Sequence, residues 1–571
     1  MVIIICIISV LPWIGLGDFS TKGEPREAAV AISMLESGNW ILPQTYANEF
    51  AYNPPMAHWL MAVFSYPQGY VSEFTSRLPS ALAFITLIGF VLVFFGKRIK
   101  FQQAFIATLL LITCIEIHRA AMTTRVDMLL TAFIVIGLFQ LFRWEDDLEL
   151  KGLPISIPIL LGCAVLTKGP VGIILPLFVF GAYLLMLRKY SLLIIFKTLV
   201  YAGVSSLFLP LLWYLAAYKQ GGDQFLNVVL AENFGRFFHL KTPDINYELG
   251  HEMGAWYNFV TLAAGFIPWT IFFFFSLFGL KLHKPGKTCK EIVKDCWANI
   301  QAMEKEKLFS LVALVCIIFF YSIPSSKRSV YLMPAYPFIA IFLAQYAIYI
   351  TEYRMKVTRL FAAFIASIVA VVLIAAGLTM TGIINPVAIA EQYTQRQSTL
   401  ETVSMVSGMF TSPDTCTILI LIILLIFLIT VYYQMFKKIN IKILYATIAL
   451  SFGINLLIDG VVMRSIREGS SSRPFAVQVM KEYPLDDNNM FVMNNLKQYR
   501  NLYGLNFYLK NRFHNFEQDQ PASGYLFSTE RDIQTIQNKY GDKYTFGLLT
   551  STTNLIPEVK DKIVLYSFAI K

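Results

Sequence analysis

Long apolar blocks recur along almost the whole chain and limit what it can fold into. The hydrocarbon core of a bilayer is about 30 Å thick, which an α-helix crosses with about 20 residues. Only 15% of the 571 residues are charged, against roughly 25% in a soluble globular protein. The sequence therefore predicts an α-helical polytopic membrane protein with about 13 transmembrane helices and excludes a water-soluble enzyme. The expected helices lie near residues 2–16, 78–96, 102–118, 128–142, 155–167, 170–187, 192–217, 257–282, 308–323, 330–350, 360–382, 416–435 and 443–462.

Lysine and arginine are unevenly shared between alternate loops. The loops at 97–101, 143–153, 188–197, 281–307, 351–359 and 436–442 hold 21 of these residues in 69 positions. The other set, at 17–77, 119–127, 167–169, 218–256, 324–329 and 383–415, holds 12 in 151 positions. Because positive loops stay in the cytoplasm, the first set is expected there and the second on the outer face. The net charge of +10 follows from these scattered loops, so nucleic acid is not an expected partner.

The chain divides into two expected domains. Residues 1–463 form the transmembrane domain, and residues 464–571 a small α/β domain on the outer face, because short β-like runs there alternate with helix-like stretches. The β-like runs are 490–493, 525–527, 544–549 and 563–568, and the helix-like stretches include 473–482 and 531–540. The first outer loop, 17–77, is expected to carry amphipathic surface helices at 24–36 and 56–66.

Charged residues gather at the outer ends of the expected helices. An ionisable group close to hydrocarbon is costly unless it is paired or hydrated, so such residues are candidates for function. Four clusters qualify: Asp18 with Lys22, Glu24, Arg26 and Glu27; Arg119 with Arg125 and Asp127; Lys168; and Lys327 with Arg328 and Tyr331. Each of the first two clusters also has a purely structural explanation. Glu24 with Arg26 could form the first turn of a surface helix, where an acid is favourable, and Arg119 and Arg125 could extend their charged ends to the membrane interface.

Sugar transfer from a polyprenyl phosphate uses such groups together. Cations hold the phosphate leaving group, and a carboxylate accepts the proton of the attacking hydroxyl. The chain has no nucleotide-binding loop, which favours a lipid-linked donor over a nucleotide sugar.

Several stretches carry a family resemblance. Residues 23–28 (GEPREA), 34–43 (MLESGNWILP), Asn53-Pro54-Pro55 to Trp59 and 76–81 (SRLPSA) closely resemble the first outer loop of bacterial aminoarabinose transferases. Those enzymes are relatives of the dolichyl-phosphate-mannose protein mannosyltransferases, among the C-type membrane glycosyltransferases. Asp127, the turn at 166–170 and residues 326–334 also look like landmarks of the family. The resemblance spans roughly residues 1–350.

The resemblance implies thirteen membrane helices, an undecaprenyl-phosphate-sugar donor, inversion at the anomeric carbon and location in the bacterial inner (plasma) membrane with the C-terminal domain in the periplasm. It also implies an Asp-Glu pair in the first outer loop and a Glu-Lys pair before the prolines. Here Gly23 stands in place of the Asp, and Tyr52-Asn53 in place of Glu-Lys. The usual first carboxylate and one phosphate-binding cation are therefore missing.

The sequence leads to the hypothesis of an integral-membrane glycosyltransferase whose acceptor, such as lipid A, another glycolipid or a protein, faces the periplasm. The expected catalytic residues are Glu24, Asp127 and Asp18. The expected phosphate or donor ligands are Arg26, Asn53, Arg125, Lys168, Lys327, Arg328 and Tyr331. Contact with the acceptor or a metal is assigned to His239, His251 and Glu252. No cofactor is required, although a divalent metal stays open, and a lipid-linked sugar flippase and a non-catalytic membrane sensor are the alternative functions.

Overall fold

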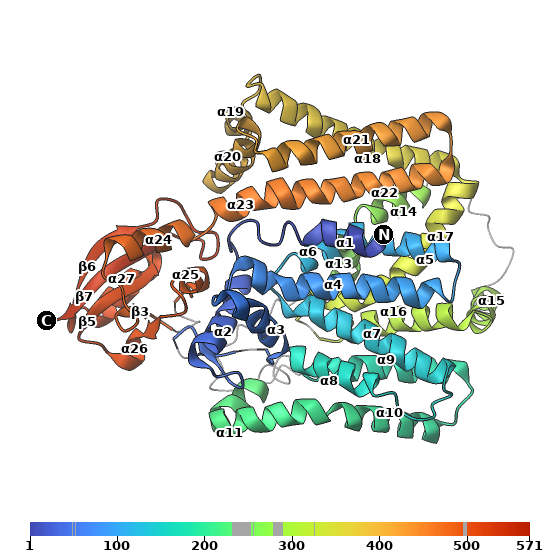
Figure 1. The fold of residues 1–571 in the computed structure, drawn as a ribbon, viewed down its shortest axis with the longest axis horizontal. Helices are drawn as coiled ribbons and strands as arrows, with labels where there is room; N and C mark the ends of the chain where they lie inside the picture. Colours follow the sequence, from blue (N-terminus) through green and yellow to red (C-terminus); the bar gives the residue numbers. More distant parts are fainter. Residues whose placement is uncertain are drawn as a thin grey trace.

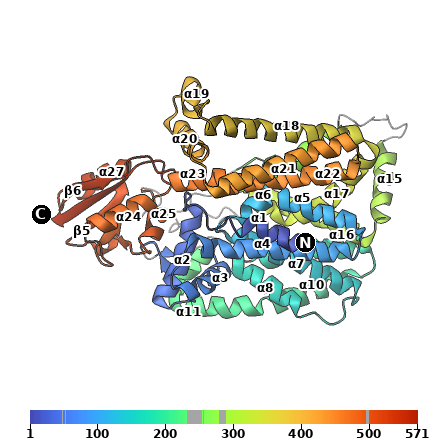
Figure 2. The ribbon, with the colours of Figure 1, turned by 45° about the horizontal axis from the view of Figure 1, so that its top comes forward.

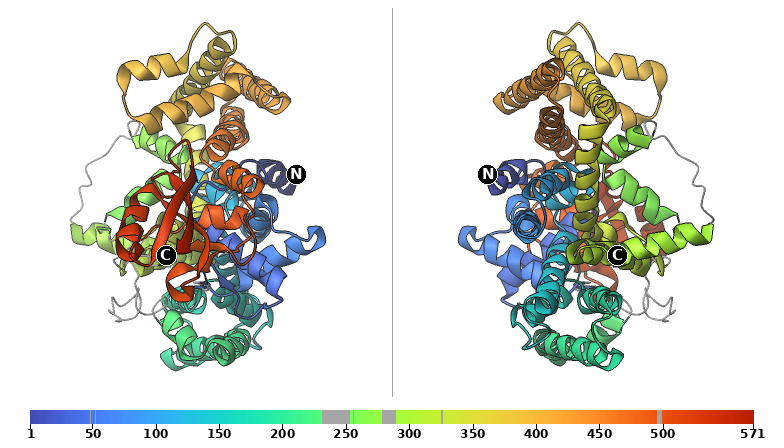
Figure 3. Two further views of the ribbon diagram at one scale, coloured as in Figure 1. Left: turned by 90° about the vertical axis from the view of Figure 1, so that its left-hand side faces the viewer. Right: turned by 90° about the vertical axis from the view of Figure 1, so that its right-hand side faces the viewer.

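The computed structural model describes residues 1–47, 49–51, 53–230, 253–254, 256–277, 289–324, 326–494 and 499–571. A bundle of long helices forms most of the molecule, and a five-stranded sheet with short helices lies at one end of it (Figure 1). Viewed along the bundle, α10 (Leu192–Ser206) and α11 (Phe208–Leu230) lie at one edge, and α18 (Met355–Met380) lies at the opposite edge (Figure 3).

Each expected membrane run coincides with a helix or a bent pair of helices, as far as the described residues extend. Six helices are long and apolar enough to cross a membrane, or up to nine if each bent pair is one span, so the number thirteen stays a prediction. The remaining bundle helices are α1 (Val2–Val10), α4 (Glu73–Gly96), α5 (Phe101–Thr113), α6 (Ile115–Ala121), α7 (Val126–Asp146), α8 (Ser156–Lys168), α9 (Val171–Leu187), α13 (Tyr257–Gly265), α14 (Trp269–Leu277), α16 (Lys305–Ser322), η3 (Ser329–Ala335), α17 (Tyr336–Tyr353), α21 (Thr415–Lys437), α22 (Asn440–Leu457), η4 (Ile458–Met463) and α23 (Arg464–Gly469). Outside the bundle core lie α15 (Cys289–Gln301), α19 (Pro386–Tyr393) and α20 (Gln397–Thr411).

Reciprocal capping fixes the start of α4, the helix that carries Arg77. The Ser72 hydroxyl accepts the N–H of Thr75, and the Thr75 hydroxyl accepts the N–H of Ser72. Such a capping box satisfies two backbone donors that the first helical turn leaves open. The first turn of α4 is therefore held rigidly where it meets the first outer loop.

The first outer loop contains α2 (Gly23–Ser37), the short strands β1 (Gln44–Thr45) and β2 (Glu49–Phe50), α3 (Met56–Ser65) and the 3₁₀ turn η1 (Tyr66–Gln68). Two helices were expected here and both are found. However, α2 is not a surface helix with one apolar stripe, because almost every residue from Glu24 to Met34 is buried. It packs against α3 on one side and against α25 (Tyr503–Tyr508) on another. These contacts bury the faces of α2 that the sequence predicts to be exposed to solvent.

The C-terminal residues form a mixed sheet in the order β4-β3-β5-β7-β6. Its strands are β3 (Met490–Val492), β4 (His514–Asn515), β5 (Ser523–Thr529), β6 (Tyr544–Ser551) and β7 (Ile563–Ile570), and its helices are α24 (Arg473–Glu482), α25, α26 (Phe516–Asp519) and α27 (Glu530–Tyr540). The β3, β4 and β5 strands are parallel, whereas β5, β7 and β6 are antiparallel. The expected β-like runs coincide with β3, β5, β6 and β7. The last bundle helix continues to Gly469, past the expected boundary at 463.

Side chains of α24 and α25 fasten the sheet-bearing part to the first outer loop. Arg473 donates to Asp18 (3.0 Å). The Tyr508 hydroxyl donates to Glu73 (3.0 Å) and accepts the N–H of Phe19 (2.8 Å). As a result, α2 and α3 lie between the bundle and the sheet in both views (Figures 1 and 2).

Candidate functional site

The turn before α7 joins two of the expected clusters. The backbone N–H of Thr124 donates to Glu24 Oε1 (3.0 Å), and the Ser80 hydroxyl donates to the carbonyl of Arg125 (3.1 Å). The Thr124 hydroxyl also donates to Ser76 (3.1 Å). Residues of α2 and α4 therefore hold the backbone of the turn from which Arg125 and Asp127 extend.

Glu24 forms a buried ion pair with Arg77. Arg77 Nε donates to Glu24 Oε1 (2.9 Å), and the Arg77 side chain is fully buried. Burial alone would raise the pKa of Glu24, but the charges of Arg77 and Arg467 and the hydrogen bonds from Arg77 and Thr124 hold it below the ordinary value of 4.5. Glu24 is therefore ionised at neutral pH, with its carboxylate oxygens bound within the protein.

Arg77 was not expected as a site residue. The rest of its guanidinium donates to backbone carbonyls that follow α1, those of Ile14 (2.9 Å) and Gly17 (3.0 Å). A signal existed in the sequence, because Arg77 directly precedes an expected membrane helix and meets the same criterion of charge near hydrocarbon.

Gly23 lies beside the guanidinium of Arg125. A Cβ at position 23 would be 3.5 Å from Arg125 Nη2, which is ordinary contact distance. Within the described residues, the Arg125 guanidinium makes no hydrogen bond or ion pair with another side chain. The position at which the family resemblance implies a carboxylate thus faces a cation in this chain.

Asp127 and Lys168 form an ion pair between the first turn of α7 and the last turn of α8. The ammonium of Lys168 also lies over the ring of Tyr331, 4.4 Å from its centroid. Asp127 is buried, but the Lys168 side chain keeps 23% of its surface exposed. Three expected residues from distant parts of the sequence therefore meet, and the cation among them can be reached from outside.

Lys327 and Arg328 lie at the start of η3, which packs against α7 and α16. Lys327 is buried and donates to the carbonyl of Met253 (3.2 Å). Arg328 is exposed. In the described structure neither side chain forms a hydrogen bond or an ion pair with Asp127 or Lys168. The residue of this turn that meets Lys168 is Tyr331.

Arg26 and Asn53 surround the carboxylate of Glu27, which the sequence placed in the first charged cluster but to which it gave no role. Arg26 Nη2 lies 2.9 Å and Asn53 Nδ2 lies 3.1 Å from Glu27 Oε1. His58 Nε2 lies 2.8 Å from Glu27 Oε2, and His58 is buried. Burial would raise the pKa of Glu27, but Arg26 and His58 hold it well below its usual range. The sequence thus located Glu27 but gave no signal that Arg26, Asn53 and His58 would be its partners.

The other expected residues lie apart from this cluster or outside the described residues. Asp18 pairs with Arg473 of α24, where the first outer loop meets the sheet-bearing part. His239, His251 and Glu252 lie outside the described residues. In the part of the chain that the structure describes, no group of three His, Cys, Asp or Glu side chains can hold a metal ion. The residues around Gly23 do not fit a metal either, because they present the guanidinium of Arg125.

Comparison with known proteins gives matches of sequence and of fold. Residues 52–214 match the family described as dolichyl-phosphate-mannose-protein mannosyltransferase. An undecaprenyl phosphate-alpha-4-amino-4-deoxy-L-arabinose arabinosyl transferase of Shewanella sediminis (strain HAW-EB3) is 24% identical over 347 residues, covering 60% of this chain and 58% of that protein. The family resemblance expected from the sequence is confirmed. A protein of Aquifex aeolicus (strain VF5), described as uncharacterized, is 29% identical over 334 residues, covering 56% of this chain and 59% of that protein.

The fold match extends over nearly the whole chain. The crystal structure of ArnT from Cupriavidus metallidurans in the apo state has a TM-score of 0.70 at 16% identity, covering 99% of this chain and 97% of that chain. The structure of the same protein bound to undecaprenyl phosphate has a TM-score of 0.69 at 15% identity with the same coverage. This chain is thus ArnT-like in fold, while its sequence matches span less than two thirds of the length of the two relatives above.

Proposed function

We propose that the protein transfers a sugar from a polyprenyl-phosphate donor to an acceptor on the outer face of the bacterial inner membrane. The observation that carries this proposal is the meeting of Asp127 and Lys168 beside Tyr331, with Arg125 two residues before Asp127 in the chain and its guanidinium beside Gly23. One cation there is accessible and another has no side-chain partner in the described structure. An ArnT-like fold supports it, because the solved relative is a protein bound to undecaprenyl phosphate.

Lys168 and Arg125 would neutralise the charge that develops on the phosphate as the bond to the anomeric carbon breaks. Arginine suits two-point contact with a phosphate, and lysine acts as a point charge. Asp127 pairs with Lys168 and so holds it in position. Its carboxylate would also accept the proton of an attacking hydroxyl. The attacking oxygen bonds to the anomeric carbon on the face opposite to the phosphate, so the configuration inverts.

Glu24 takes a positioning role in this proposal. Its carboxylate is buried against Arg77 and accepts the N–H of Thr124, so it orients the turn that carries Arg125. Arg125 then supplies the donor-binding cation that position 53 lacks. An acceptor that is already ionised, such as a lipid A phosphate, needs no strong base and fits the missing carboxylate at Gly23 best. A glycolipid or protein hydroxyl would depend more on Asp127.

The test is transfer of radiolabelled sugar from a polyprenyl phosphate to bacterial outer lipids in proteoliposomes. Wild-type protein should form product, and both Asp127→Asn and Lys168→Ala should reduce the rate at least tenfold. Lys197→Ala is the matched control. It removes an exposed lysine of α10 on the expected cytoplasmic side of the membrane and should keep the wild-type rate. Equal rates in all four proteins would overturn the site assignment.

The same assay separates the two alternative functions. A flippase or transporter would move the lipid-linked sugar across the membrane without breaking its bond to phosphate. A sensor would yield no donor-dependent product with any acceptor. The replacement of the implied Asp by Gly23 is the observation that favours the sensor, and product formation by the wild type would exclude it.

The proposed topology has thirteen membrane spans and places the C-terminal residues in the periplasm. Leu548 of β6 and Cys296 of α15 are both exposed and lie on opposite expected sides of the membrane. A membrane-impermeant maleimide should modify Leu548→Cys in intact spheroplasts and Cys296 only after lysis. The reverse pattern would invert the topology and move the candidate site to the cytoplasm.

A further inference from the structure

Two cavities join along α4 and α7 to make one long groove. The larger has a volume of about 600 Å³ and the smaller about 430 Å³, and Phe90 and Gln140 line both. Lining positions recur every three or four residues on α4, from Pro79 to Lys97, and on α7, which is the spacing of one helix face. We call this feature the α4–α7 groove.

The α4–α7 groove is as long as the hydrocarbon core is thick. From Pro79 to Lys97, α4 and its C-cap rise about 27 Å at 1.5 Å per residue, close to the core thickness of about 30 Å. The groove is lined mainly by apolar side chains between its ends, and Phe90 and Val93 are 41% and 56% exposed. It is open to the surrounding lipid. An acyl chain of one leaflet covers about half of the core, which corresponds to the part of the groove from Thr86 to Lys97, about 16 Å long.

One end of the α4–α7 groove is strongly charged. Lys97, Arg98 and Arg143 line it together with Asp146 and Asp147. Arg143 Nε lies 3.0 Å and Arg98 Nη2 lies 3.7 Å from the carboxylate of Asp147. Among the described residues, Lys97 takes part in no ion pair or side-chain hydrogen bond. The lining cations therefore outnumber the carboxylates, and one of them is left for a ligand.

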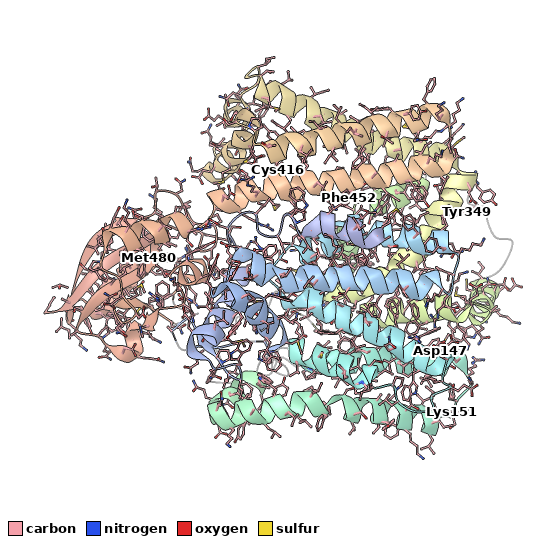
Figure 4. The ribbon with its side chains drawn as sticks, viewed as in Figure 1. Asp147, Lys151, Tyr349, Cys416, Phe452 and Met480 are labelled. Atoms are coloured by element: carbon pink, nitrogen blue, oxygen red, sulfur yellow. The ribbon has the colours of Figure 1, made fainter. Side chains whose placement is uncertain are left out.

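The guanidinium at this end is held in a fixed place. Arg98 lies over the ring of Phe94, 4.6 Å from its centroid, and over Phe142 at 5.6 Å. Asp146 in turn accepts from Lys305 of α16 (2.9 Å), which also lies 3.9 Å from the buried Glu145, so the carboxylate of Asp146 is paired from behind the groove. Figure 4 shows Asp147 at the end of the bundle away from the sheet, so this charged end is remote from the candidate site.

We propose that the α4–α7 groove binds an anionic glycerophospholipid, with its phosphodiester at Lys97, Arg98 and Arg143 and an acyl chain along the apolar part. Basic pockets between membrane helices on the cytoplasmic side are suited to anionic lipid headgroups. The excess of cations selects a net negative headgroup over a zwitterionic one. The proposal does not depend on sugar transfer, and by the proposed topology the lipid belongs to the cytoplasmic leaflet.

The test is native mass spectrometry of the full chain in mild detergent, after separate incubations with phosphatidylglycerol, with phosphatidylcholine of identical acyl chains, and with undecaprenyl phosphate. The wild type should retain phosphatidylglycerol preferentially. Lys97→Gln should reduce its retention about fivefold, the effect of one basic residue near a lipid surface. Thr86→Trp should reduce retention of both lipids, because Thr86 is an exposed residue of the groove and an indole there would occupy the space of the acyl chain.

The matched control is Lys442→Gln, which removes an exposed lysine at the start of α22, outside the groove. This variant should bind lipid as the wild type does. Equal retention of the two lipids by the wild type, or equal loss in Lys97→Gln and Lys442→Gln, would overturn the proposal. So would a fivefold loss of undecaprenyl phosphate in Lys97→Gln without loss of phosphatidylglycerol, because the groove would then belong to the donor. The sugar-transfer assay is a separate experiment, and its result does not depend on any of these outcomes.

Discussion

Arg77 and Glu24 form a buried ion pair, and their Nε and Oε1 atoms lie 2.9 Å apart. The pair ties the end of α1, the start of α2 and the turn before α7 together, because Arg77 also binds carbonyls after α1 and Glu24 also accepts the N–H of Thr124. Removing one partner of a buried ion pair leaves the other charge uncompensated.

The first prediction concerns the stability that this pair provides. Arg77→Leu should lower the free energy of unfolding by about 3–5 kcal/mol, since Glu24 would stay buried without its cation. The measurement is the thermal unfolding midpoint in detergent. Adding Glu24→Leu to Arg77→Leu should recover part of the loss, because the uncompensated charge is then gone.

Lys151→Ala serves as the control for this prediction. Lys151 pairs with Glu149 on the surface, where its side chain is 83% exposed and such pairs contribute little. Its thermal midpoint should match the wild type. If the double variant is less stable than Arg77→Leu alone, the pair is not held by charge compensation.

The second prediction tests the space beside Gly23. A carboxylate at position 23 would meet the guanidinium of Arg125, because a Cβ there already lies 3.5 Å from Nη2. Gly23→Asp should therefore raise the KM for the polyprenyl-phosphate donor about tenfold, the effect of losing one charge-assisted contact. Gly23→Ala fills the same space without the charge and should stay within about twofold of the wild type. A higher kcat in Gly23→Asp would show instead that the missing acid is catalytic.

Much of the fold follows from the sequence because apolar length and loop charge are local properties. The expected runs coincide with helices, and four β-like runs coincide with β3, β5, β6 and β7. The burial of α2 was not foreseeable, since it depends on α3 and on α25, which lies more than 450 residues further along the chain. The two-residue strand β4 is too short to leave a period-two pattern.

The sequence predicted which charged residues lie at the candidate site, but not which of them form ion pairs with one another. Sequence position brought Asp127, Lys168 and Tyr331 to one side of the membrane, and the structure brings them into contact. Which cation neutralises which carboxylate depends on helix packing, so the pairing of Glu24 with Arg77 and of Asp18 with Arg473 had no signal in the sequence order. Glu24 and Asp18 lie in the same loop, yet Glu24 pairs with an arginine of α4 and Asp18 with an arginine of α24.

The third prediction is a pH dependence of stability carried by Glu558. Its carboxylate is buried and accepts the N–H of Gly504 at 3.0 Å. Burial raises the pKa of Glu558 to about 7, although that hydrogen bond and the charge of Lys22 act in the opposite direction. Because the folded pKa is raised above the ordinary value of 4.5, the folded state binds the proton more tightly, and this contribution to stability is lost as the pH rises from 4.5 to about 7.

Glu558→Gln should remove that loss. The variant keeps an acceptor for Gly504 and carries no charge, so it should be more stable than the wild type at pH 8 by up to about 3 kcal/mol and equal to it near pH 4.5. The measurement is the difference between the two unfolding midpoints at each pH. A constant difference across this range would show that Glu558 stays protonated, or stays ionised, throughout.

The last prediction separates the ring of Tyr331 from its hydroxyl. The Lys168 ammonium lies 4.4 Å from the ring centroid, a distance at which a cation is attracted to an aromatic face. Tyr331→Leu should raise the donor KM about two- to fivefold, which corresponds to the loss of about 0.5–1 kcal/mol. Tyr331→Phe keeps the ring and should bind the donor as the wild type does. If Tyr331→Phe is as impaired as Tyr331→Leu, the hydroxyl contacts the substrate, and the ring does not act by holding Lys168.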